Sequence, residues 1–480
     1  MRSRLSTRNR ALAAIVAVLP ATALLTSVTA APAAAKPQAD DRGVIVNMFQ
    51  WNWDSVAAEC AEVLGPQGFG GVQVSPPQES ISLPGADHPW WEVYQPVSYQ
   101  LTSRLGDRAD FAAMVRSCDA AGVDVYVDAV LNHMTGQNNG GTGYGGSTFT
   151  DKHVYPGLYS GNDFHYHPQH CPNPSGEIAD YDNLAEVQNC ELLGLADLRT
   201  DFYYVRDTLV AYLNDLVGLG VDGFRVDAAK HIPADDLRAI ADRVDADVYQ
   251  EVIPGGAVRL DPYRASGDLL EFTFARKLKE QFHGNIAHLE TIGESWGMQP
   301  DEYAVTFVDN HDTERDGSTL SYRDGPTYRL ATVFTLAWDY GSPQVYTGFR
   351  FSGRDESPPA NADGTVRPVD CGSGEWTCTH RDPAVRGMVG WRSAVAGAPV
   401  RNWWTNGDNA IAFSRGDAGF VAINNTSAPL TREFTTGLPQ GTYCDVLAAS
   451  DGQCVQVSGS GRATITVQPK DAVAIHVATE

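Results

Sequence analysis

The chain has 480 residues and a formal net charge of −24 at pH 7. This length is enough for two or three domains around a large core. A strongly acidic surface repels phosphate backbones and anionic lipids, so the composition argues against nucleic-acid and membrane partners. The acidic composition does not argue against a neutral substrate.

The first 35 residues have the features of a secretory signal peptide. Four arginines lie within the first ten residues, residues 11–25 are apolar, and a run of small residues ends at Ala35. This order is typical of a cleaved export signal, and the apolar run is too short and too interrupted to span a membrane. We therefore expect a secreted, soluble protein whose fold begins after residue 35.

The eight cysteines are an even number, as expected for disulfides in an oxidising compartment. Spacing alone cannot fix their connectivity. Short loops favour the pairs Cys171–Cys190, Cys371–Cys378 and Cys444–Cys454, which leaves Cys60 with Cys118. No C-x-x-C pattern occurs, so we do not expect zinc or redox chemistry.

Short apolar segments alternate with amphipathic segments of helical length from residue 44 onward, which is typical of parallel β/α units. Helices are expected at 55–64, 110–121 and 201–219. Strands are expected at 44–51, 69–75, 123–131, 223–227, 247–252, 269–274, 305–309 and 344–347. Eight strands predict a closed (β/α)₈ TIM barrel. An open Rossmann-like sheet is the alternative, but no G-x-G-x-x-G opens a helix here.

Two regions break this alternation. Residues 134–190 are rich in Gly, Asn, His, Tyr and Pro, and so long an irregular segment is normally functional or a small domain of its own. We therefore expect an inserted domain at 134–195, between barrel parts at 36–133 and 196–395. At 396–480 we expect a C-terminal antiparallel β-sandwich that serves as a scaffold. Its expected strands are 410–414, 420–424, 431–434, 441–446 and 463–467.

Charged residues stand at the ends of several expected strands. Arg225 and Asp227 lie two residues apart and so face the same side of one strand. An isolated pair of this kind is more often a structural ion pair than a catalytic one. However, Glu251 and Asp312 also follow strand ends, and these ends converge on one face of a TIM barrel. Glycoside cleavage needs such a set, with one carboxyl as general acid and another as nucleophile or base.

Several motifs, taken in order, resemble the signature blocks of the α-amylase family of glycoside hydrolases, and the likeness is greatest to animal-type members. They are Asp128–His133, Gly223–His231, Glu251 within Tyr-Gln-Glu-Val-Ile, and Phe307–Asp312, with further similar blocks at Phe69–Pro77 and Gly341–Tyr346. The resemblance implies that Asp227 is the nucleophile, Glu251 the general acid/base and Asp312 the residue that holds sugar hydroxyls. The family is retaining, which implies carboxyl groups about 5–5.5 Å apart.

The resemblance also implies a substrate-binding set. Trp90, Trp91, Tyr94 and Gln95 match the family's aromatic platform, on which the apolar faces of sugar rings stack. Two core tryptophans are the alternative interpretation, but neighbouring residues on a strand face opposite sides. The remaining matches are His133, Arg225, Lys230, His231 and His311, and Arg225 is expected to keep Asp227 ionised.

Calcium is implied by the resemblance alone, because no contiguous calcium loop exists. The matching ligands are the side chains of Asn132 and Asp197 and the backbone carbonyls of Gln188 and His231. Animal-type relatives also bind chloride through an Arg, an Asn and a second basic residue. Arg225 and Asn310 match, but Gln344 is neutral, so we expect no chloride requirement.

The sequence therefore predicts a monomeric secreted α-amylase that cleaves internal α-1,4 bonds in starch and malto-oligosaccharides. A transglycosylase or a debranching relative on the same barrel is the alternative within enzymes. A non-catalytic carbohydrate-binding homologue is the alternative outside them, although such homologues lose one of the three carboxylates and this chain keeps all three.

Overall fold

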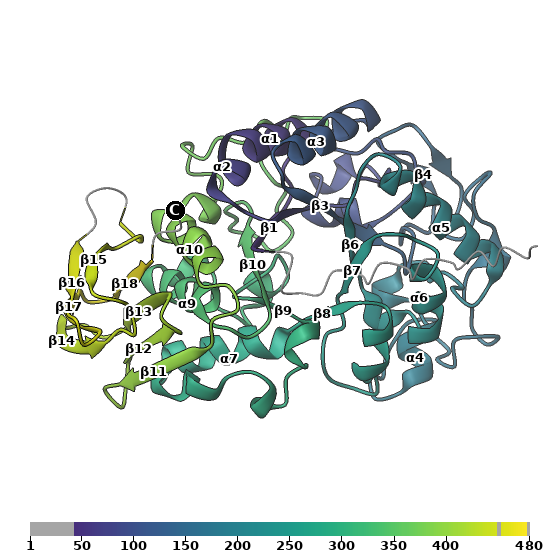
Figure 1. The fold of residues 1–480 in the computed structure, drawn as a ribbon. Coiled ribbons are helices and arrows are strands. Elements are labelled where there is room, and N and C mark those ends of the chain that lie inside the picture. The colour runs from purple at the N-terminus through teal and green to yellow at the C-terminus, as the bar shows by residue number, and fades with distance from the viewer. Residues whose placement is uncertain (1–42, 449–452, 478–480) are drawn as a thin grey trace, which may run out of the picture. The chain divides into compact units, whose positions relative to one another are not determined.

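Short parallel strands form the centre of the structure (Figure 1). The computed structural model describes residues 43–448 and 453–477, and the predicted signal peptide lies outside them. Eight of the described strands close into a barrel whose neighbours follow chain order, and β1 pairs with both β2 and β10. These strands are β1 (Ile45–Met48), β2 (Gly71–Val74), β3 (Asp124–Val130), β6 (Gly223–Asp227), β7 (Asp247–Gln250), β8 (Asp268–Leu270), β9 (Ala304–Phe307) and β10 (Ser342–Thr347). The predicted TIM barrel is confirmed.

Both faces of these strands are covered, which explains their nearly continuous apolar sequence. Every residue of β1 and β2 is buried. Figure 1 shows α3, α5, α6, α7 and α9 outside the ring of strands. The described helices of the barrel are α1 (Trp53–Glu59), α2 (Gly65–Gln67), α3 (Arg108–Ala120), α5 (Tyr203–Val217), α6 (Ala234–Ala241), α7 (Phe272–His283), α8 (Thr313–Asp316), α9 (Pro326–Ala337) and α10 (Pro383–Ala394).

Several predicted elements differ from the structure in their bounds, and two of these differences have a clear local reason. The sixth barrel strand, expected to run to residue 274, ends at Leu270 because Glu271 accepts a hydrogen bond from the Thr273 N–H and caps α7. The first helix begins at Trp53 rather than Ser55, because Asn52 is the capping residue. It continues as a π-helical turn at Cys60–Leu64.

The segment between β3 and β6 holds little regular structure. It contains a small hairpin, β4 (Gly141–Thr142) with β5 (Thr148–Phe149), one short α-helix, α4 (Leu184–Asn189), and two 3₁₀ turns at Gly161–Asp163 and Leu192–Gly194. The Cys171–Cys190 disulfide joins its two halves. The other three predicted pairs, Cys60–Cys118, Cys371–Cys378 and Cys444–Cys454, are also bonded, which confirms all four.

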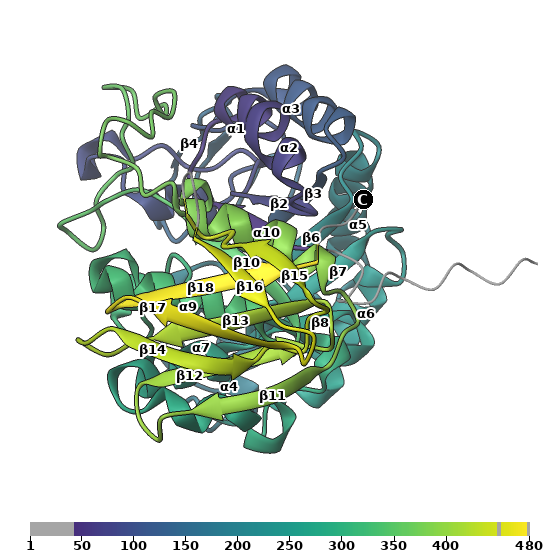
Figure 2. The same ribbon diagram turned by 60° about the vertical axis from the view of Figure 1, so that its left-hand side comes forward.

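The C-terminal region is an antiparallel β-domain (Figure 2). Its four-stranded sheet has the order β11 (Val400–Thr405), β12 (Ala410–Arg415), β13 (Gly419–Asn424) and β18 (Asp471–His476). Two further pairs are β14 (Leu430–Thr435) with β17 (Arg462–Val467) and β15 (Gly441–Cys444) with β16 (Cys454–Val457). Sequence reasoning missed β11, β16 and β18.

The central strands β12 and β13 of the four-stranded sheet are buried on both faces, whereas the edge strand β11 is partly exposed. Phe420 and Ile475 pack with Phe434 and Ile465 in the core of the sandwich. Alternate residues of these strands point to the other face of the sheet. Residues on that face, such as Phe413, pack into the core of the barrel. The Phe413 ring lies 5.4 Å from that of Trp338, which directly follows α9.

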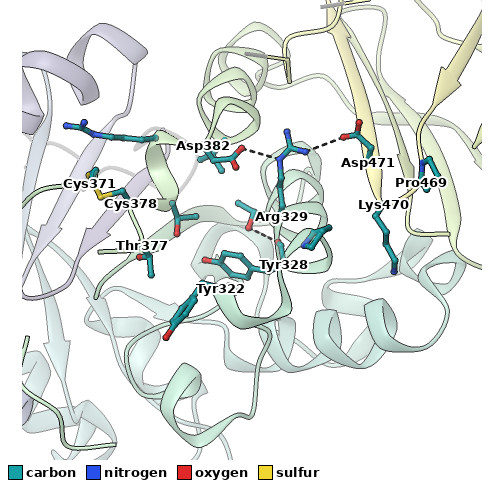
Figure 3. A pocket seen from close by; sticks show the side chains of 16 residues that line it. Tyr322, Tyr328, Arg329, Cys371, Thr377, Cys378, Asp382, Pro469, Lys470 and Asp471 are labelled. Atoms are coloured by element: carbon teal, nitrogen blue, oxygen red, sulfur yellow. Dashed lines mark hydrogen bonds and ion pairs between the residues drawn. A yellow bond between two sulfur atoms is a disulfide. The ribbon is translucent and has the colours of Figure 1, made fainter. Parts of the chain in front are cut away.

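A cavity of about 720 Å³ lies beside this junction (Figure 3). Arg329 of α9 lies in its wall and bridges two acids. Its Nε is 3.2 Å from Asp382, the cap of α10, and its Nη1 is 3.3 Å from Asp471, the first residue of β18. The cavity holds none of the predicted site residues. Among the described residues, no helix is long and apolar enough to cross a membrane.

Candidate active site

The strand ends bring the predicted catalytic residues to one end of the barrel. Parallel pairing sets Asp128 of β3 beside Arg225 of β6, and Arg225 beside Tyr249 of β7. Asp227 ends β6 and Glu251 directly follows β7. Side chains at the carboxyl ends of barrel strands share one face, so a set scattered through the sequence becomes a single cluster.

Arg225 is the centre of this cluster. Its side chain is 2 % exposed, and its Nη1 donates to Asp128 and to Asp227, at 2.6 Å in each case. Its Nη2 lies 2.8 Å from Oε1 of Glu251. One guanidinium thus faces three buried carboxylates. Because a single positive charge cannot balance three negative charges in a poorly solvated site, the group is expected to retain protons and to titrate as a unit.

The pKa shifts follow from this arrangement. Burial raises the pKa of Glu251, the charges of Asp227 and Asp312 raise it further, and Arg225 opposes them. Burial also raises the pKa of Asp227, but Arg225 opposes it both by charge and by a direct hydrogen bond. Oε1 of Glu251 accepts no hydrogen bond from the described residues. The two carboxyls thus differ in their neighbours: Asp312 acts on both, Asp227 acts on Glu251 as well, and the hydrogen bonds come from Arg225 at Asp227 and from Ala228 at Glu251.

Backbone geometry supports Glu251 from the neighbouring strand. Ala228, directly after Asp227, has a φ of 48°, a left-handed conformation that costs an L-residue about 1–2 kcal/mol. Its N–H donates to Oε2 of Glu251 at 2.9 Å. Strained conformations of this kind cluster at functional sites, where the surrounding structure holds them in place.

A cavity of about 380 Å³ opens over the three carboxylates that were predicted to be catalytic. Asp227, Glu251 and Asp312 all line it. Seven predicted substrate-binding residues also line it: Trp90, Trp91, Tyr94, His133, Lys230, His231 and His311.

Two predicted substrate-binding residues, Arg225 and Gln95, do not line this cavity. Arg225 lies beneath the carboxylates. The side-chain oxygen of Gln95 accepts hydrogen bonds from Thr135 and Gly136, so Gln95 supports the loop rather than facing the cavity.

Trp90 and Trp91 lie on a 3₁₀ helix, Trp90–Tyr94, rather than on a strand. Both are partly exposed. The indole N–H of Trp90 donates to the carbonyl of Arg354 at 2.9 Å. Glu92 within the same turn is fully buried and accepts from Tyr144 at 2.7 Å. The turn is thus anchored from below by Glu92, while both tryptophans face the cavity.

Two of the three histidines that line the cavity, His133 and His311, are fully buried, which favours their neutral form. Burial lowers the pKa of His133 to about 4 and that of His311 well below its usual value. The His133 ring contacts the carbonyl of Tyr94 at 3.0 Å. The His311 ring stacks on Phe49 and on Tyr94, at centroid distances of 4.6 and 5.2 Å. Neutral imidazoles can both donate and accept hydrogen bonds, as sugar hydroxyls require.

Sequence reasoning missed an apolar part of the cavity wall. It is formed by Tyr181, Leu192, Leu193, Leu195 and Ile253. Leu193 is 85 % exposed, which is unusual for a leucine, and its φ is 54°. The Leu-Leu-Gly-Leu run at 192–195, inside an otherwise polar insert, was the available signal.

Comparison with known proteins decides between the classes of enzyme that could carry this site. The model of the α-amylase catalytic domain matches residues 92–255, and that of the α-amylase C-terminal all-beta domain matches residues 403–478. An α-amylase of Thermomonospora curvata is 47 % identical over 98 % of this chain and 79 % of its own length. An α-amylase of the insect Tenebrio molitor is 42 % identical over 92 % of this chain and 98 % of its own.

The chain belongs to the α-amylase family. Among solved structures, a variant of α-amylase I from Eisenia fetida in complex with maltohexaose has a TM-score of 0.88 and 38 % identity. The match covers 91 % of this chain and 98 % of that one. These animal relatives accord with the expected likeness to animal-type members, and the family makes the chain a glycoside hydrolase.

The residues expected to bind calcium in this α-amylase fit an oxygen-binding cation. Asn132 and Asp197 are buried, 1 % and 2 % exposed, and the Asp197 carboxylate contacts the His165 ring at 2.6 Å. Gln188 lies on α4, where the carbonyl of Val187 accepts a hydrogen bond from the His231 ring at 2.9 Å. Burial raises the pKa of Asp197 to about 6. A buried carboxylate beside an amide and backbone carbonyls is a hard donor set.

The position of the chloride site's second basic residue holds a buried Gln344. Its amide N–H groups donate to Gln73 at 2.8 Å and to the hydroxyl of Tyr249 at 3.1 Å. Asn310, the predicted second ligand, accepts hydrogen bonds from the N–H groups of Asp312 and Thr313. Its own Nδ2 has no hydrogen-bond partner among the described residues.

Proposed function

We propose that this protein hydrolyses internal α-1,4-glucosidic bonds in starch and malto-oligosaccharides with retention of the α-anomeric configuration. The observation that carries the proposal is the set of three carboxylates, Asp227, Glu251 and Asp312, in the floor of one cavity with aromatic walls. A glucan presents apolar ring faces to tryptophans and hydroxyls to carboxylates and neutral histidines.

Asp227 is the proposed nucleophile. Its hydrogen bond from Arg225 favours the carboxylate, which can attack the anomeric carbon. Glu251 is the proposed general acid, because burial and two neighbouring acids favour its protonated form. It gives its proton to the glycosidic oxygen as the bond between that oxygen and the anomeric carbon breaks, and the released part of the glucan leaves with a free hydroxyl. After the glycosyl-enzyme forms, the deprotonated Glu251 removes a proton from water, which then attacks the anomeric carbon and releases Asp227.

Asp312, His133 and His311 are the proposed contacts for sugar hydroxyls in the cleaved subsite. Trp90, Trp91 and Tyr94 supply the stacking surface. Lys230 is proposed to serve a neighbouring subsite, with His231 beside it. The Nζ of Lys230 donates to the Gly255 carbonyl at 3.0 Å and lies 5.5 Å from the centre of the Tyr181 ring.

Calcium is proposed as a structural ion, held by the side chains of Asn132 and Asp197 and by the carbonyls of Gln188 and His231. Bound there, it would neutralise a buried carboxylate and join the predicted inserted domain to β3 and to the turn after β6. Export is also proposed, supported by the signal-like residues 1–35 and by four disulfides.

Proton NMR of fresh soluble-starch digests, with chromatography of the products over time, tests the proposal. We expect the α-anomer to appear first, together with a broad range of malto-oligosaccharides. The β-anomer appearing first would contradict retention. Predominantly transferred or cyclic products would indicate a transglycosylase, and cleavage confined to branch points a debranching enzyme. No release of sugar would indicate a binding protein.

A further inference from the structure

Arg315 is a buried cation for which the proposed mechanism has no role. It lies on α8, three residues after Asp312, and its side chain is 1 % exposed. Its guanidinium lies 4.9 Å from the centre of the Trp90 ring and 4.2 Å from that of Phe351. Phe49 and Phe349 each lie 5.2 Å away. Four aromatic rings thus surround one charge.

The polar contacts of Arg315 are few for so buried a cation. Nη1 donates to the carbonyl of His311 at 2.6 Å and to Oε1 of Glu314 at 2.9 Å. Nε and Nη2 have no hydrogen-bond acceptor among the described residues. Glu314 is itself fully buried and also accepts from the Tyr346 hydroxyl. Because burying an incompletely bonded guanidinium is expensive, a role in the site rather than in stability is the better explanation.

The contacts of Arg315 lead to the wall of the cavity. It holds the carbonyl of His311, whose ring stacks between Phe49 and Tyr94. It also packs on the indole of Trp90. Asp312 lies between His311 and α8, so its backbone is fixed on both sides by residues that Arg315 contacts.

We propose that Arg315 is a positioning residue that holds the His311–Asp312 turn and the Trp90 ring in the arrangement that the glucan requires. This proposal rests on the proposed function of the same cavity. Arg315 does not line that cavity, so it acts through these neighbours rather than on the substrate.

The positive charge of Arg315 also affects the pKa of Asp312. The pKa of Asp312 is raised by burial and by Asp316, and it is lowered by Arg225, Arg315 and Arg354. His311 also faces it, with Nε2 3.4 Å from Oδ2. Removing Arg315 therefore takes away one of three cations that favour the ionised form, and the pKa of Asp312 is expected to rise.

The test compares Arg315→Met and Arg315→Lys with the wild-type enzyme on soluble starch. Methionine fills the aromatic cage without charge, and lysine keeps the charge without the planar group. We expect kcat of Arg315→Met to fall on the order of a hundredfold, as for other losses of alignment. The acidic limb of its pH–rate profile should move to higher pH. Arg315→Lys should restore the position of that limb but only part of kcat.

Arg323→Met is the matched control. Arg323 is exposed and its guanidinium lies 4.1 Å from the centre of the same Phe351 ring. The Arg323→Met variant should keep the wild-type kcat and pH profile.

Wild-type kcat and pH profile in folded Arg315→Met would overturn the proposal, as would a lowered melting temperature with unchanged kcat. If Arg315→Met does not fold, Arg315→Lys decides, and wild-type kcat in that variant overturns the proposal. Failure of the proposed function is distinct, because the wild-type enzyme itself would then release no α-anomeric products.

Discussion

Asp128 and Asp227 accept hydrogen bonds from the same nitrogen atom, Nη1 of Arg225, at 2.6 Å each. Asp128 also accepts from the Tyr94 hydroxyl at 2.9 Å, and burial raises its pKa to about 7. The proposed nucleophile therefore shares its counter-ion with a second acid that does not line the cavity. The charge available to Asp227 depends on the protonation of Asp128, and so does the acidity of Glu251.

Asp227→Asn and Glu251→Gln should each lower kcat roughly a thousandfold or more while the fold remains intact, because each removes a proposed reacting group without changing its size. Initial rates on soluble starch and circular dichroism measure the two properties. Asp207→Asn, a matched change at an exposed ion pair on α5, is expected to keep full activity. Near-wild-type turnover in either active-site variant would remove that residue from its role.

Activity should be nearly independent of chloride. Within the described part of the chain, Arg225 is the one cation that pairs with Glu251, so no second charge needs to be offset by a bound anion. Dialysis into chloride-free buffer, followed by titration with sodium chloride at constant ionic strength, measures this. A saturable several-fold rise in rate would contradict the prediction, and the unpartnered Nδ2 of Asn310 is then the group to examine. Gln344→Lys supplies the missing cation and should make the rate chloride-dependent.

Chelation should lower the melting temperature and, more slowly, the activity. A metal bound only by the folded state stabilises it by mass action, and Asn132 and Asp197 are expected to hold it. Scans in excess chelator and in excess calcium, together with metal analysis of the dialysed protein, measure the effect. Equal melting temperatures and no bound metal would show that the ligands are wrongly assigned. Asp197→Asn should lower the melting temperature and abolish its response to calcium.

Acid should destabilise the contact between α1 and the turn before α10. There, Glu59 accepts hydrogen bonds from His380 and from Arg381, and these partners lower its pKa to about 2 against the opposing effect of burial. A depressed carboxyl pKa stabilises the fold fully above pH 4.5, and the stabilisation is lost as the pH falls through about 2. Because Arg381 is partly exposed, solvent screening reduces the contribution to on the order of 2 kcal/mol.

Glu59→Gln should therefore melt below the wild-type protein at pH 7, and the gap should close toward pH 2–3. Glu62→Gln, an exposed neighbour on the same helical segment, is the control. A gap of constant size across this pH range would mean that packing, rather than charge, explains the loss.

The sequence predicted the residues whose position follows from strand periodicity. Asp227 ends one buried strand and Glu251 directly follows another, so the barrel alone places them at one face. The wall at Leu193 and the cage around Arg315 could not be predicted in this way, because both depend on contacts between loops distant in the chain. The contacts of the Gln95 side chain with Thr135 and Gly136 could not be predicted for a related reason. A motif shows which residues neighbour the site, but only the fold shows which way each side chain points.

The sheet of β11, β12, β13 and β18 limits how this enzyme can be divided. Phe413 and its neighbours complete the hydrophobic core of the barrel, while Phe420 and Ile475 belong to the sandwich. The indole N–H of Trp391 on α10 donates to the carbonyl of Ile475 across the boundary. Truncation before β11 would leave α9 and α10 with bare apolar faces. The C-terminal sheet thus covers the outer apolar faces of α9 and α10. A design that transfers the catalytic barrel to another scaffold would have to include these strands.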